Sequence, residues 1–422
     1  MILENKKKLS KPYNTLFTKR DKKKRTLIIP NLSHSFSVIS ASVVRGMGYN
    51  AIALPFANDE AKKLGKAYVH NDACFPAQVN VGEFLYFFKK NSLNPSQIAC
   101  VLAKNCKDCR AGQYSVLTRK ALDMAGFNEV AIVTSGEDTK KIHPGFKANL
   151  FFQWKMLWGI VIIDLLDYML RATRPYENVL GETDKLYEYY LEKIAKSLEK
   201  GVKKALNSLD EAVLAFNSIS VNNTLKKPKV FIIGEILLNY HDTANRNLVK
   251  YLEKNGMEVI IPDMINFFWR QFYVDKIMAT RKMIKNSFLI KIRAIVFDII
   301  IKFVIKRVNK IAEKFRFYER KPNIKELAKN VDGIIDHSIV AGEGWLIPAE
   351  IIHYAKKGVS SFIIVQPFGC LPNHITGRGI IQLLKEKFPQ INILSIDYDF
   401  DVSMANIENR LQMLLMALKQ HS

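Results

Sequence analysis

Two cysteines with two residues between them offer the chain's clearest chemistry. They are Cys106 and Cys109 in the segment KNCKDCRAGQYS, and three more occur in the 422 residues, namely Cys74, Cys100 and Cys370. The odd number and wide spacing argue against a disulfide framework and for metal or redox chemistry. The C-x-x-C spacing alone leaves three alternatives open: a metal-ligand pair, a reversible disulfide, or a loop without chemistry.

The choice of metal follows from the sulfur ligands. Thiolates select zinc or an iron-sulfur cluster, and ligands drawn from distant loops do not separate the two by spacing. A structural zinc site usually combines two local C-x-x-C pairs, and this sequence has no second pair. The pattern therefore favours an iron-sulfur cluster over zinc.

Composition and charge limit the classes of protein. The chain has 422 residues, of which 48% are hydrophobic, and this is enough to bury more than one core. Its first 25 residues lack the apolar core of a signal peptide, and no run approaches the ~20 apolar residues of a membrane span. We therefore expect a soluble, cytoplasmic protein without a membrane span.

The formal net charge of +23 raises the question of nucleic-acid binding. Much of the basic charge is spread over predicted helices, so no nucleic acid is expected, and weak attraction to an anionic ligand or an acidic partner is the main functional consequence. Residues 287–308 are strongly apolar, but charged residues interrupt them, which favours a covering helix or a partner surface over membrane association.

Short β-branched runs alternate with amphipathic segments, which is typical of parallel α/β units. The first series of predicted strands is 26–30, 50–55, 66–70, 98–105 and 129–135. The second series is 230–237, 257–262, 331–339, 360–366 and 391–399. The sequence thus predicts an α/β fold with two related, doubly wound parallel-sheet domains of the flavodoxin or Rossmann type, carrying helical inserts.

The predicted domain boundaries follow from this pattern. A basic N-terminal tail covers residues 1–25, an α/β domain 26–150, a helical segment 151–225 and a second α/β domain 226–422. The second domain contains a helical insert over about 264–325. A break near Arg174-Pro175 is expected, because proline disfavours helix in the residue before it.

Three cysteines are predicted to lie in strand-to-helix loops: Cys74, Cys109 and Cys370. Such loops gather at the carboxyl edge of a parallel sheet, where ligands bind and helix N-termini favour thiolates. Cys100 instead lies within the apolar run IACVLA and is predicted to be a buried core residue. Cys106 stays a candidate fourth ligand.

Polar residues near the same edges are further candidates. Asn373, His374 and Arg378 in CLPNHITGRG are expected to donate hydrogen bonds around a cluster. Candidates for pocket lining or proton transfer are Glu235, His241 and Glu343. For each of these three, a capping or hydrogen-bonding role without chemistry is the alternative.

Several longer segments resemble the 2-hydroxyacyl-CoA dehydratase family, and in particular the branch associated with ATP-dependent dehydratase activases. The segments are GKAYVHNDACFPAQVNVGEFL, CRAGQYSVLTRKALDMAGF, GEILLNYHDTANRNLVKYLEKNGMEVIIPD, GEGWLIPAEI and QPFGCLPNHITGRGIIQLLKEKFP. RATRPYEN is also similar. The likeness covers most of residues 27–415, with three cysteine motifs in the same order.

The resemblance implies an iron-sulfur cluster held by Cys74, Cys109 and Cys370, either 4Fe-4S or a linked double cluster. It also implies a separate activase that hydrolyses ATP and supplies one electron, a homodimer or a heterodimer with a related subunit, and an acyl-CoA substrate that loses water through a ketyl radical. Cys106 does not match the family's usual ligand. No GxxxxGK[ST] phosphate loop occurs in the sequence, so ATP-driven reduction would need another chain.

Three classes of function follow. The first is a dehydratase-like reductive enzyme, the second an electron-transfer or double-cluster protein, and the third a zinc-stabilised scaffold. Three cysteines on a four-iron cluster would leave one iron open to a ligand, which favours the enzyme.

Overall fold

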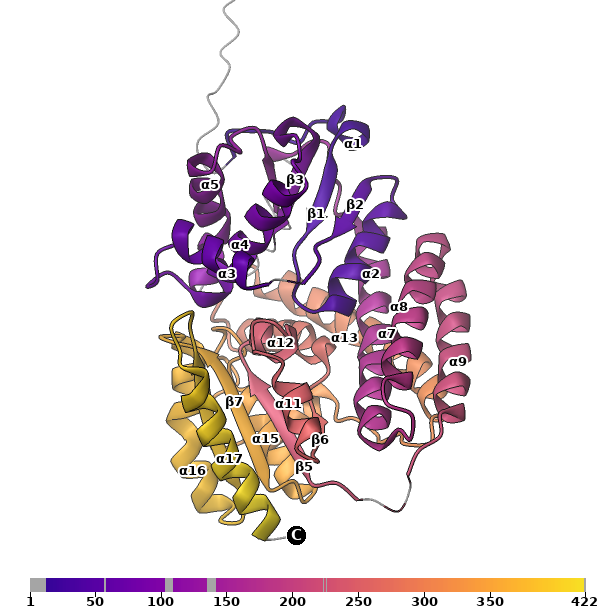
Figure 1. The fold of residues 1–422 in the computed structure, drawn as a ribbon, viewed down its shortest axis with the longest axis vertical. Helices are drawn as coiled ribbons and strands as arrows, with labels where there is room; N and C mark the ends of the chain where they lie inside the picture. Colours follow the sequence, from indigo (N-terminus) through magenta and orange to yellow (C-terminus); the bar gives the residue numbers. More distant parts are fainter. Residues whose placement is uncertain are drawn as a thin grey trace, which may run out of the picture. The chain divides into compact units, whose positions relative to one another are not determined.

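The computed structural model describes residues 13–56, 58–102, 109–134, 142–222, 224 and 226–420. The chain forms two compact units, Met1–Gln153 and Trp154–Ser422 (Figure 1). Each contains one four-stranded parallel sheet flanked by helices. The predicted α/β class with two doubly wound parallel sheets is therefore confirmed.

The sheet of the first unit has the strand order β2-β1-β3-β4. Its strands are β1 (Thr26–Ile29), β2 (Asn50–Ala53), β3 (Ile98–Leu102) and β4 (Ala131–Thr134). The helices are α1 (Asp21–Lys24), α2 (His34–Arg45), α3 (Asp59–Tyr68), α4 (Phe75–Lys90) and α5 (Tyr114–Met124), with 3₁₀ turns η1 (Pro95–Gln97) and η2 (Arg110–Gln113).

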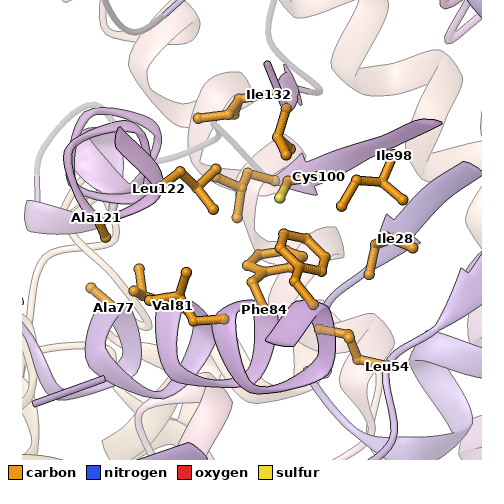
Figure 2. Close-up of a cluster of buried hydrophobic side chains, with 14 of the residues drawn as sticks. Ile28, Leu54, Ala77, Val81, Phe84, Ile98, Cys100, Ala121, Leu122 and Ile132 are labelled. Atoms are coloured by element: carbon orange, nitrogen blue, oxygen red, sulfur yellow. The ribbon is translucent and has the colours of Figure 1, made fainter. Parts of the chain in front are cut away.

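Alternate residues of these strands face two different hydrophobic clusters, which is why the short runs are apolar throughout. Ile28 pairs with Cys100, and Cys100 with Ile132; all three join the cluster that α4 and α5 cover. Their chain neighbours on the opposite side, such as Leu27, pack with α2. Figure 2 shows Cys100 facing Phe84 of α4, and this confirms its prediction as a core residue.

The segment before β1 is part of the first unit from Tyr13 onward. Phe17 is fully buried in the cluster beside α2, and the guanidinium of Arg25 donates to the carbonyl oxygens of Ile98 and Glu129 at 3.0 and 2.8 Å. The tail predicted for residues 1–25 differs from this arrangement, because apolar residues among the basic ones anchor the chain. Residues 1–12 lie outside the described part.

The sheet of the second unit repeats the same order as β6-β5-β7-β8. Its strands are β5 (Lys229–Gly234), β6 (Glu258–Ile260), β7 (Ser361–Pro367) and β8 (Asn392–Tyr398). Around them lie α10 (Ile236–Tyr240), α11 (Leu248–Lys254), α14 (Ile324–Asn330), α15 (Leu346–Lys356), α16 (Ile381–Lys387) and α17 (Met404–Gln420).

Several long helices precede β5 in the sequence or lie between β6 and β7. They are α7 (Leu150–Thr173), α8 (Glu182–Lys200), α9 (Val202–Ser218), α12 (Met264–Thr280) and α13 (Ser287–Ala312). The expected break near Arg174-Pro175 is confirmed by the 3₁₀ turn η3 (Arg174–Tyr176). Arg174 there grips Glu253 of α11 with two hydrogen bonds of 2.7 and 3.0 Å, which ties the helical segment to the sheet domain.

Two predicted strands are not strands. Residues 66–68 are part of α3. The N-cap residue of this helix is Asn58, whose side chain accepts a hydrogen bond from the amide of Ala61. Residues 331–339 form turns, in which Asp336 accepts from the amide of Ser338 at 2.8 Å and from Arg281. In both segments, local hydrogen bonds engage backbone groups that a strand would use for pairing. A short apolar run is therefore not sufficient to form a strand.

Helices α3 and α4 pack backbone to backbone at two glycines. A Cβ atom at Gly65 would lie 2.1 Å from the carbonyl oxygen of Gln78, and one at Gly82 would lie 2.1 Å from that of Ala61. The loop between these helices ends at Cys74, which precedes α4. The two glycines therefore determine how closely that loop is held.

We predict that Gly65→Ala destabilises the first unit by about 1–3 kcal/mol, because the added methyl group overpacks a backbone contact. Helix propensity alone would stabilise it by about 1 kcal/mol, so the sign of the change is diagnostic. The measurement is denaturant unfolding followed by circular dichroism. All four tryptophans lie at or after Trp154, so their fluorescence reports the second unit as an internal reference.

The control is Lys63→Ala at an exposed position of the same helix. It should change the free energy of unfolding by no more than about 0.5 kcal/mol. A Gly65→Ala protein more stable than the parent would contradict the close packing of α3 on α4.

Candidate functional site

In the second unit, the site is built at the carboxyl ends of the two central strands. The strand order reverses between β5 and β7, and this switch point is where open α/β sheets bind ligands. Glu235 follows β5 directly, and Cys370 lies three residues after β7. The structure thus confirms the predicted strand-to-helix position of Cys370.

Cys370 and Glu343 share one hydrogen-bond donor. The side-chain amide of Asn373 lies 3.4 Å from the Cys370 sulfur and 2.9 Å from Oε2 of Glu343. Asn373 is fully buried in the π-helical turn η4 (Asn373–Gly377). This is the hydrogen bond to sulfur that the sequence led us to expect from Asn373.

His374 is fixed beside the same cysteine. Its Nδ1 lies 2.8 Å from the carbonyl oxygen of Cys370, and a carbonyl oxygen only accepts, so Nδ1 carries a proton. In the neutral ring Nε2 then holds the lone pair. The geometry suits His374 to accept a proton through Nε2.

Glu235 and Glu343 form a pair of acidic side chains at the switch point. Glu343 accepts from the amide of Ile236 at 2.8 Å, and Glu235 accepts from that of Leu238 at 3.0 Å. Burial, together with the charge of Glu343, raises the pKa of Glu235 to about 8. Burial also raises the pKa of Glu343, so the pair retains a proton near neutral pH.

Cys370 experiences the same negative surroundings. Burial raises the pKa of its thiol to about 12, with the charge of Glu343 as the next cause. The thiol is therefore protonated at neutral pH unless a cation is present to stabilise the thiolate. A bound metal centre is the kind of group that would reverse this preference.

Backbone contacts hold the acidic loop in place. Arg270, which is almost fully buried, donates from Nη1 to the carbonyl of Ile339 at 3.3 Å and from Nη2 to those of Val340, at 3.3 Å, and Gly342. Gly342 has φ of +52°, and a Cβ there would lie 2.5 Å from Cγ of Pro372. Glu343 is thus positioned against the loop that carries Cys370.

Two predicted site residues have partners elsewhere. His241 is fully buried, and its Nδ1 accepts from the amide of Ala244 at 3.2 Å. Arg378 is paired with Asp397 of β8, with 2.6 Å between Nη2 and Oδ2. The capping alternative suits His241, while the arginine orients Asp397 at the edge of the sheet.

In the first unit, the prediction for Cys74 was wrong in one respect. Cys74 lies between α3 and α4, and not after a strand, because the predicted strand at 66–70 is helical over Lys66–Tyr68. Its sulfur lies 3.2 Å from the hydroxyl of Tyr114. It still stands directly before a helix, as the cap residue of α4.

Cys109 follows β3 in the chain and caps η2, which leads into α5, as predicted. The next residue, Arg110, donates from Nη1 to the carbonyl oxygens of Asp72 and Ala73 at 2.9 and 3.1 Å. These carbonyls immediately precede Cys74. One guanidinium therefore ties together the two loops that carry Cys74 and Cys109.

Cys109 and Cys370 occupy equivalent places in the two units. Each follows the third strand of its unit, β3 or β7, in sheets with the same strand order, and each precedes a tight helical turn.

Cys106 lies outside the described residues. Burial raises the pKa of the Cys100 thiol well above its usual range, which agrees with a core role.

Within the described ranges, no three His, Cys, Asp or Glu side chains are grouped so that they could hold a metal ion. No protein-family model matches the sequence, and no curated protein is significantly similar to it.

Sequence reasoning missed the side chains that position the candidates. Arg110 and Tyr114 contact the Cys74 loop, and Arg270 holds the loop of Glu343. Arg110 stands next to Cys109 in the sequence, but its partners are backbone carbonyls of another loop. No pattern of residue types in the sequence predicts a hydrogen bond from a side chain to the backbone of a distant loop.

We predict that the stability of the second unit depends on the proton held by Glu235. Its pKa is raised from 4.5 to about 8, so the proton's stabilising contribution is complete below about pH 4.5 and is lost as pH rises through about 8. Glu235→Gln removes this titration. The variant should gain roughly 2–4 kcal/mol relative to the parent between about pH 5 and about pH 9.

Unfolding followed by tryptophan fluorescence measures this difference across the pH range. Buried carboxyl groups remote from Glu235 titrate in both proteins and cancel in the comparison, whereas Glu343 interacts with Glu235, so the difference reports the titration of the pair. Glu192→Gln, at an exposed position of α8, is the control and should follow the parent. Parallel curves for Glu235→Gln and the parent would show that Glu235 is ionised at neutral pH.

Proposed function

We propose that this chain is an iron-sulfur protein whose cluster is held by Cys74, Cys109 and Cys370, and which acts in reductive chemistry on an acyl-CoA. The proposal rests on the resemblance to 2-hydroxyacyl-CoA dehydratases and on the positions of the cysteines. Under it, an ATP-dependent activase supplies the electron. The cluster would be 4Fe-4S or a linked double cluster.

The observation that carries the proposal is the equivalence of Cys109 and Cys370. A sulfur recurs after the third strand of both sheets, at the edge where such sheets bind ligands. An unrelated structural cysteine has no reason to repeat at this place. Arg110 supports the third ligand, because it fastens the Cys74 loop to the Cys109 loop.

The residues present are compatible with a cluster. The three sulfurs are partly buried, and the Asn373 amide donates to one of them, as a negatively charged cluster requires. The two carboxyl groups of Glu235 and Glu343 add negative charge nearby. The proton that they retain lowers this repulsion, and the raised thiol pKa of Cys370 means that ligation must displace its proton.

A cluster bound by these cysteines would supply one-electron reduction at low potential. The chain's own residues handle protons and position. Glu235 carries a proton at neutral pH and is the proposed donor for the loss of water from a 2-hydroxyacyl group, and His374, whose Nδ1 is held by the carbonyl oxygen of Cys370, is the proposed acceptor. The net charge of +23 favours approach of an anionic CoA or an acidic electron donor.

The first experiment is anaerobic purification with analysis of iron and acid-labile sulfide. We expect a brown protein that contains both elements. Cys109→Ser should lose the visible absorbance, because a ligand is removed, whereas Cys100→Ala should retain it, because that side chain lies in the core. Zinc without sulfide would contradict the proposal and favour the scaffold.

The second experiment tests whether one iron binds substrate. Reduction by a separate activase and addition of 2-hydroxyacyl-CoAs should change the electron paramagnetic resonance signal, because an open iron site senses the ligand. An unchanged signal, together with conversion to a site-differentiated form in Cys106→Ala, would show four thiolate ligands. The chain would then be an electron-transfer protein.

A homodimer or a heterodimer with a related subunit is also proposed, since the family pairs such chains. Shielding an open-sided cluster from water gives the physical reason. Light scattering of the cluster-loaded protein distinguishes a dimer from a monomer.

A further inference from the structure

Helix α13 (Ser287–Ala312) exposes an apolar stripe along most of its length. The stripe consists of Phe288, Ile292, Ile295, Val296, Ile299 and Phe303. Their spacing of three, four or seven residues places them on one side of the helix. Phe288 is 74% exposed and Ile299 61%, so these side chains contribute little to the core of the unit.

The opposite side of α13 supplies the packing that the fold needs. Ala294, Ile301, Val304 and Val308 are buried there. Aromatic stacking of Phe272 in α12 on Phe297, with ring centroids 4.3 Å apart, adds to it. The exposed stripe is therefore a second apolar face that folding of the unit does not require.

The surroundings of the stripe are strongly basic. Residues 281–310 contain nine Lys or Arg and one acidic residue, Asp298. That carboxylate is already engaged, because it accepts from Nε1 of Trp269 at 3.0 Å and from Lys302. A partner on this face meets apolar side chains between cations.

Aromatic residues extend the stripe onto α7. Phe303 contacts Trp158 at 6.2 Å between ring centroids, and Trp158 contacts Trp154 at 5.7 Å. Trp154 is 37% exposed. Tryptophan at the margin of an apolar surface is well suited to the boundary between lipid and water.

We propose that this face of α13 lies on the surface of an anionic lipid bilayer, with the helix parallel to the membrane plane. Branched aliphatic and phenylalanine side chains would enter the acyl boundary, while Lys and Arg meet the lipid phosphates. The helices in the described ranges include none that is long and apolar enough to cross a bilayer.

Charge decides against a second copy of the chain as the occupant. A two-fold contact would place one basic segment against another, and like charges at an interface are unfavourable. Arg281 and Lys302 are already paired with Asp336 and Asp298, but the other seven Lys and Arg of residues 281–310 still far outnumber the acidic residues there.

The test is co-sedimentation of the full chain with vesicles of phosphatidylcholine alone, or of phosphatidylcholine with phosphatidylserine. We expect binding to the anionic vesicles only, with at least a tenfold loss on raising the salt concentration. The double variant Ile292→Glu/Ile299→Glu should lower binding at least tenfold, because two charges enter the apolar stripe. The matched control is Met413→Glu, at a 71% exposed methionine of α17, which should bind as the parent does.

Three results would overturn the proposal. They are the absence of binding to the anionic vesicles, equal binding of the double variant and the parent, or a dimer in light scattering that the double variant dissociates. Circular dichroism of each variant confirms that it is folded. Iron content is measured separately, so that failure here is distinct from failure of the cluster assignment.

Discussion

The close approach of Gly234 to β7 determines where the site of the second unit lies. Gly234 ends β5 with φ of +155°, and a Cβ atom there would lie only 1.8 Å from the carbonyl oxygen of Val365. A side chain at this position would push the two central strands apart. Glycine fits this close approach, and the amide of the next residue, Glu235, donates to the same carbonyl oxygen at 2.9 Å, which places Glu235 at the switch point.

This geometry has an electrostatic consequence. Glu235 and Glu343 are close enough that the charge of one disfavours ionisation of the other. Burial and the same negative charges raise the pKa of Cys370, whose sulfur contacts the Asn373 amide that also donates to Glu343. The unit can keep two acids and a thiol together because they retain protons and because backbone amides and one side-chain amide donate to them. A site of this kind responds strongly to any cation or redox change near the sulfur.

Sequence reasoning was successful where the local pattern and the tertiary structure agree. The β-branched run at 361–367 is a strand buried on both faces, and Cys100 within IACVLA is a core residue. The strand predicted at 66–70 is wrong, because residues 66–68 are part of α3, which packs on α4 at Gly65. The pairing of Glu235 with Glu343 is also beyond prediction from the sequence, because Glu343 lies 108 residues after Glu235 and only the fold brings the two together.

The same distinction explains why three cysteines are not equivalent. Cys109 and Cys370 occupy one topological position twice, so strand order alone accounts for their placement. Cys74 has a different origin, because it ends the connection between α3 and α4, which precedes β3 in the chain. Its position depends on the two glycine contacts between those helices and on the hydrogen bonds of Arg110 to the Cys74 loop. The sheets therefore place two of the three cysteines, whereas helix packing places the third.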